Sequence, residues 1–179
     1  MGVKGRRIVK NVNEPTLLGN IDDIIAKAKE DGFVNDCIVD IESIVKKENI
    51  DIKKEDLPSS ISGYLIKING RWTIGINKNH HVHRQRFTIA HEFAHYCLHK
   101  TDNDYFEDEV FFRDDVQTSI EYAANTFASI LLMPNDLIAK VIKDGLISLK
   151  KLAAKFDVST LAVKNRVLNL GYKLANDEE

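Results

Sequence analysis

The segment His91-Glu92-Phe93-Ala94-His95 places two histidines four residues apart with a glutamate between them. On an α-helix, residues i and i+4 lie on one face, about 6 Å apart along the axis. Two imidazoles in that position can bind one zinc ion, whose bonds to nitrogen are about 2.0–2.1 Å long. Glu92 lies further round the helix, where its carboxylate suits a general base that takes a proton from water. The spacing therefore predicts the catalytic centre of a zinc hydrolase.

The helix predicted for residues 85–100 is apolar on most sides, and its polar residues form one stripe. The stripe consists of Thr88, His91, Glu92, His95 and His99. A helix that is apolar on its other faces is buried, so its histidines need partners. A metal ion would supply them, and the alternative is a pair of core histidines bonded to carbonyl groups. Cys97 lies opposite the histidines, where we expect it to pack in the core.

A catalytic zinc site needs a third protein ligand and keeps one position for water. Glu121 is the preferred candidate, because it begins an apolar helix that would hold it firmly. Asn125 follows on the same face and could accept the free N–H of a ligating imidazole. Other interpretations remain open. Glu121 could instead be a first-turn glutamate that interacts favourably with the helix dipole. The third ligand could then come from His99, Glu107, Glu109, Asp114 or Asp115. Thr101 stands where the metzincin pattern requires histidine, which excludes that class.

Composition sets the broad class. The chain has 179 residues, 44% of them hydrophobic, and a formal net charge of −2. We expect one domain with at most a small appendage, no transmembrane helix, and no main role in coating nucleic acid. Two cysteines, Cys37 and Cys97, cannot build a disulfide framework, so we expect a cytoplasmic protein.

Local patterns predict an α+β fold with a small antiparallel sheet. The dipeptide Asn69-Gly70 favours a type I′ hairpin turn between strands at 63–68 and 71–76. Predicted helices span residues 21–30, 36–47, 85–100, 120–132, 135–143, 149–156 and 160–170. We divide the chain into an N-terminal helical region (1–60), a core that carries the HExxH segment (61–145) and a helical tail (146–179).

The tail has the pattern of a helix-turn-helix. Ser159 would cap its second helix, and Lys164, Asn165, Arg166 and Asn169 would face outward. Residues 146–179 contain six Lys or Arg and four Asp or Glu, a weak balance for duplex DNA. We do not expect direct DNA binding, but it stays open beside substrate docking and simple packing.

Two blocks resemble the ImmA/IrrE family of metallo-endopeptidases. They are residues 84–99, RQRFTIAHEFAHYCLH, and residues 121–134, EYAANTFASILLMP, with FFRD at 111–114 between them. The resemblance implies a zincin-like core with zinc held by His91, His95 and Glu121, and Glu92 as the base. It also implies a cytoplasmic regulatory protease that cleaves a helix-turn-helix repressor or antitoxin and so induces a stress, mobile-element or prophage response. Ala94 stands where the family often has glycine.

Two other functions are kept as alternatives: a non-catalytic, zinc-containing or DNA-associated binding module, and the toxin of a toxin–antitoxin pair. Several features remain without a firm role. The strand at 71–76, interpreted as a sheet edge, could bind an extended substrate. Tyr64, Tyr96, Tyr105 and Tyr122 are candidate oxyanion donors. His80, His81 and His83 could form a second metal site or a solvated loop, and the acidic segment 102–115 could attract basic partners or be a solvated face.

Overall fold

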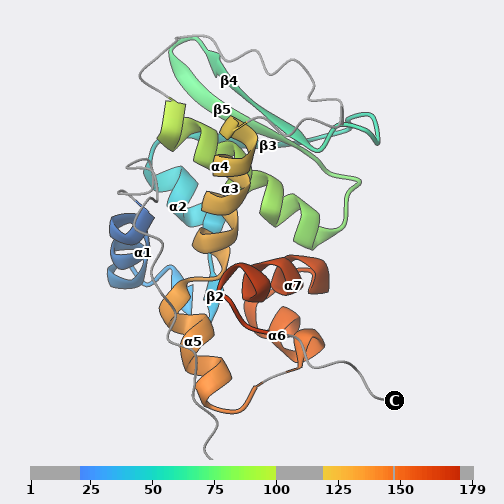
Figure 1. The fold of residues 1–179 in the computed structure, drawn as a ribbon. Helices are drawn as coiled ribbons and strands as arrows, with labels where there is room; N and C mark the ends of the chain where they lie inside the picture. The colour runs from blue at the N-terminus through green and yellow to red at the C-terminus, as the bar shows by residue number, and fades with distance from the viewer. Residues whose placement is uncertain (1–20, 100–118, 147, 174–179) are drawn as a thin grey trace, which may run out of the picture.

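The computed structural model describes residues 21–99, 119–146 and 148–173. They form an α+β fold, in which a three-stranded sheet packs on a layer of helices and further helices lie below it (Figure 1). The elements are α1 (Ile21–Glu30), β1 (Val34–Asn35), β2 (Ile38–Val39), α2 (Ile41–Lys47), β3 (Asp51–Glu55), β4 (Gly63–Ile68), β5 (Arg71–Asn77), α3 (Val82–His99), α4 (Ser119–Leu132), α5 (Asn135–Lys143), α6 (Leu149–Phe156) and α7 (Thr160–Asn169). None of the helices in these ranges is long and apolar enough to cross a membrane.

The predicted hairpin is confirmed. β4 and β5 pair antiparallel from Gly63 opposite Ile76 to Ile68 opposite Arg71. Asn69 and Gly70 both have positive φ angles, 51° and 82°, as a type I′ turn requires. The turn therefore fixes which side chains of the two strands face the helices.

The strand at 71–76 is not an edge, and our prediction on this point is wrong. The strand order is β3-β5-β4, so β5 is the central strand and pairs parallel with β3 on its other side. The sequence analysis missed β3 because its five residues, Asp-Ile-Lys-Lys-Glu, are mostly charged. Only Ile52 packs against the core, and Lys53 and Lys54 are exposed.

The region of residues 1–60 is not purely helical where it is described. The helix predicted to begin at Asp36 begins at Ile41, after a short hairpin of β1 and β2. Asp36 lies in the turn of that hairpin with a φ of 56°. Asp40 is the N-cap of α2, because its carboxylate accepts from the backbone N–H of Ser43 at 3.0 Å. The proposed boundaries at residues 60 and 145 stay a prediction.

The long helix α3 lies against the sheet on one side and against α4 on the other. Its contact with β4 is close, since a Cβ atom at Gly63 would clash with the side chain of Thr88. Phe93 of α3 and Phe127 of α4 meet edge to face, with ring centroids 6.4 Å apart, and both are fully buried. Cys97 packs against the same core, as predicted. This double contact fixes both the position and the rotation of α3.

The tail helices α6 and α7 have nearly the predicted bounds. Asp157 lies in the left-handed region between them, with a φ of 52°, and Ser159 caps α7 by accepting from the N–H of Ala162. Arg166, however, does not face outward as predicted. It is only 5% exposed, and its guanidinium donates to the Met133 carbonyl at 3.2 Å and to the Asn135 side chain. Its charge therefore holds α7 against the junction of α4 and α5.

Replacing Arg166 by alanine should destabilise the fold. The substitution removes a buried charged donor from the Met133 carbonyl, for which we expect a loss of about 1–3 kcal/mol in the free energy of unfolding. Urea denaturation at equilibrium measures it. Lys164→Ala, an exposed position on the same helix, is the control and should change stability by less than about 0.5 kcal/mol. Equal effects of the two substitutions would contradict the anchoring role.

Candidate metal centre

Three of the predicted ligands meet between α3 and α4. The Nε2 atoms of His91 and His95 are 3.0 Å apart, and each is 3.2 Å from a carboxylate oxygen of Glu121. His91 and His95 come from successive turns of α3, and Glu121 comes from the first turn of α4. Within the part of the chain that the structure describes, this is the one group of three His, Cys, Asp or Glu side chains placed to hold a metal ion.

The orientation of His91 favours metal binding. Its Nδ1 lies 3.1 Å from the side-chain oxygen of Asn125. An amide oxygen only accepts hydrogen bonds, so Nδ1 carries the hydrogen and the lone pair of Nε2 points into the cluster. The contact that the sequence predicted for Asn125 is therefore confirmed. It is the interaction that typically orients a metal-binding imidazole.

The donor set fits a tetrahedral cation. At most one hydrogen can lie between the two facing Nε2 atoms, whereas a cation satisfies both lone pairs and the carboxylate together. Zinc bonds of 2.0–2.1 Å place tetrahedral ligands about 3.3 Å from each other. The observed separations of 3.0 to 3.2 Å are close to that value. The cluster is thus already near the geometry that zinc requires.

The electrostatics of Glu121 agree with a ligand role. Burial alone would raise the pKa of this carboxyl, but the imidazoles of His91 and His95 beside it hold the pKa at about 2. The group is therefore ionised at neutral pH, the state in which a carboxylate binds a metal. Glu92 follows His91 on α3 and is buried, whereas Glu121 is half-buried, so a second carboxylate lies on the helix that carries the two histidines.

Among the described residues, the other candidates from the sequence analysis are not part of this cluster. The side chains of His99, Glu107, Glu109, Asp114, Asp115 and Tyr105 are outside the described residues. In the histidine group, one ring nitrogen of each residue has another partner: His80 contacts the Ser59 carbonyl, His81 the N–H of His83, and His83 the carboxylate of Asp157.

Tyr64 does not face the cluster. Gly63 faces α3, so the next residue of β4 points to the opposite side of the sheet. There its hydroxyl donates to Glu55 at 2.5 Å, and burial together with that carboxylate raises the pKa of Tyr64 to about 12. Tyr96 packs between the rings of Trp72 and Phe93, and Tyr122 is exposed. Tyr64 is therefore excluded as an oxyanion donor.

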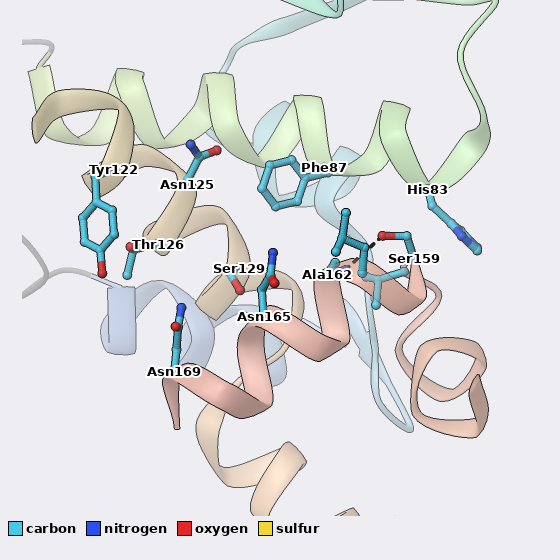
Figure 2. A pocket seen from close by; sticks show the side chains of 12 residues that line it. His83, Phe87, Tyr122, Asn125, Thr126, Ser129, Ser159, Ala162, Asn165 and Asn169 are labelled. Carbon is cyan, nitrogen blue, oxygen red and sulfur yellow. Dashed lines mark hydrogen bonds between the residues drawn. The ribbon is translucent and has the colours of Figure 1, made fainter. Parts of the chain in front are cut away.

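A groove of about 410 Å³ lies between α3, α4 and α7 (Figure 2), and two of its lining residues contact His91. Phe87, which lines it, stacks on the His91 ring with centroids 6.4 Å apart, and Asn125 also lines it. The remaining lining residues are His83, Tyr122, Thr126, Ser129, Val158, Ser159, Leu161, Ala162, Asn165 and Asn169. The sequence analysis missed this groove, although the small and amide side chains at 162, 165 and 169 follow helical spacing.

Arg86 connects the wall of the groove to the helix that carries the histidines. Its guanidinium donates to the Asp157 carbonyl at 3.1 Å and pairs with the Asp157 carboxylate at 3.1 Å. It also donates to the Val39 carbonyl of β2 at 3.0 Å. One cation from α3 therefore fixes the turn that precedes α7.

An α+β fold whose HExxH helix meets a glutamate from the following helix has the arrangement of a zincin-type metallopeptidase. The comparisons agree. The chain matches the family model of the IrrE N-terminal-like domain (Peptidase M78) over residues 45–168 and belongs to that family. No curated protein gives a significant match. The match confirms the resemblance to the ImmA/IrrE metallopeptidases and extends it beyond the two motif blocks, from α2 to α7.

Removing the carboxylate ligand should reduce metal binding. We expect about one zinc per wild-type chain and clearly less in Glu121→Ala, because two imidazoles alone leave the ion without its third protein ligand. Elemental analysis of chains loaded with zinc and then dialysed measures this. His83→Ala, which removes a histidine of α3 outside the cluster, should keep its zinc. Full retention by Glu121→Ala would move the third ligand to another residue.

Asn125 should act on metal affinity through His91. With Asn125→Ala, the imidazole loses the acceptor that fixes its orientation, and we expect the affinity for zinc to fall by about 10–100-fold. Competition with a fluorescent zinc chelator measures the affinity. Thr126→Ala, the neighbouring residue of α4, is the control. Unchanged affinity in Asn125→Ala would show that the His91 contact does not orient the ligand.

Proposed function

We propose that this chain is a zinc-dependent, site-specific endopeptidase that cleaves a helix-turn-helix repressor or antitoxin in the cytoplasm. The observation that carries the catalytic part is the cluster of His91, His95 and Glu121, three protein ligands that leave a tetrahedral ion one further position. Membership of the metallopeptidase family supports the same reaction. The regulator as substrate rests on the resemblance to ImmA/IrrE proteins.

In this mechanism, His91, His95 and Glu121 would hold the ion, and Asn125 would keep the His91 ring in its ligating orientation. When bound, zinc lowers the pKa of a water molecule and polarises a carbonyl group. The carboxylate of Glu92 accepts a proton from the attacking water as the oxygen–carbon bond forms. It then gives that proton to the nitrogen of the leaving amine as the peptide C–N bond breaks.

The burial of Glu92 supports this role. Glu92 is only 4% exposed, so its carboxylate lies among the buried side chains of α3 and away from bulk water. On an ideal helix Glu92 is rotated by about 100° from His91 and about 60° from His95. This offset leaves the carboxylate beside the ligands without making it one of them, which suits proton transfer.

Glu92→Gln should abolish cleavage and keep the metal. The amide retains the shape of the side chain but accepts no proton, so we expect a loss of activity of about 10²–10⁴-fold. The substrate is found by mapping new protein N-termini by mass spectrometry in cells of the native host that express either form. Glu30→Gln, at the exposed end of α1, is the control and should cleave like the wild type.

The outcomes separate the candidate functions. New N-termini that need Glu92 and lie in a DNA-binding regulator would support the whole proposal. Cleavage of an unrelated protein would overturn the choice of substrate but not the reaction. The absence of Glu92-dependent N-termini would overturn the enzyme, and a stable, uncleaved complex with a regulator would then favour the toxin–antitoxin interpretation.

A further inference from the structure

The groove between α3, α4 and α7 lies next to the metal centre, although none of the three candidate ligands lines it. Phe87 lies one helical turn before His91 and stacks on its ring, and Asn125 contacts His91 while lining the groove. Figure 2 shows the groove bounded by α3 on one side and α7 on the other, with α4 at its back. A polypeptide whose scissile bond lies at the cluster therefore has this groove beside it.

The length of the groove can be compared with an extended chain. Along α3, Phe87 is about 6 Å and His83 about 12 Å from His91. An extended peptide advances about 3.3 Å per residue. The groove therefore corresponds to roughly the second to fourth residues on one side of the scissile bond.

Apart from His83, which contacts the carboxylate of Asp157, the groove is lined by uncharged side chains. None of the described residues that line it is Asp, Glu, Lys or Arg. Its walls combine apolar groups, such as Phe87 and the 65% exposed Leu161, with amides such as Asn165 and Asn169. Amides can pair with a peptide backbone, whereas a charged side chain entering here would lose water without gaining an ionic partner.

We propose that this groove binds the substrate polypeptide beside its cleavage site and selects uncharged side chains at the second to fourth residues on one side. This inference rests on the proposed peptidase function. It assigns the tail helix α7 a role in substrate selection. Direct DNA binding by α7 is disfavoured, because the burial of Arg166 against Met133 and Asn135 removes one of the cations that it would use.

The test uses two exposed leucines of α7. Leu161 lines the groove, and Leu168, 45% exposed, does not. The probe is a synthetic peptide that spans the cleavage site found by N-terminal mapping, with five residues on each side, and zinc-loaded full-length chains cleave it. Leu161→Asp should lower kcat/KM by about tenfold, and Leu168→Asp should leave it nearly unchanged.

A change of specificity distinguishes binding from general damage. On one side of the scissile bond, peptides carrying lysine at the second, third or fourth residue should be poor wild-type substrates. At one or more of these positions on that side, Leu161→Asp should cleave the lysine peptide better than the wild type does, because the new carboxylate pairs with it. Asn165→Asp, another exposed position of the groove, should behave in the same way.

Each outcome decides the proposal. If the peptide is cleaved but Leu161→Asp and Leu168→Asp have equal effects and neither Leu161→Asp nor Asn165→Asp improves a lysine peptide, the groove does not bind substrate and the peptidase function stands. If the mapping yields no Glu92-dependent cleavage site, both proposals fail together. Melting temperature and zinc content of each variant show whether a loss of activity reflects unfolding.

Discussion

The packing of α3 against α4 is the interaction on which the rest of the structure depends. The candidate metal ligands come from two helices separated by a long segment, yet their donor atoms lie 3.0 to 3.2 Å apart. Such spacing requires both helices to be fixed in rotation as well as in position. The Phe93–Phe127 contact holds the interface, and the close approach of Gly63 to Thr88 seats α3 on the sheet. The sheet acts as a support for one helix, and the core around Phe127 aligns the other.

Much of this could be predicted because it depends on local rules. The Asn69-Gly70 turn follows from the left-handed backbone that these residues tolerate. The contact of Asn125 with His91 follows from the four-residue spacing between Glu121 and Asn125 on one helix face. The strand β3 could not be found in this way. Its charged residues lack strand character, and it is ordered by hydrogen bonds to β5, which is distant in sequence. Missing it made the central strand look like an edge.

The tail shows a second limit of sequence reasoning. A helical pattern predicts where α7 begins and ends, but not what covers each face. Arginine is a residue type that usually faces solvent. Arg166 is nevertheless buried, because two acceptors at the α4–α5 junction accept hydrogen bonds from its guanidinium. The groove was missed for the same reason, since three elements far apart in the sequence form it.

The contacts of Arg86 have a consequence for the kind of target that can enter the groove. By joining α3, the turn at Asp157 and β2, this one guanidinium keeps the walls from separating. The groove is therefore preformed. The conformational entropy lost on binding is mainly that of the incoming polypeptide, and it costs about 1–2 kcal/mol for each backbone residue that becomes fixed. A segment already held in its own helix or sheet must first unfold. The local stability of the partner's structure, and not only its amino-acid sequence, would then determine where the partner is cleaved.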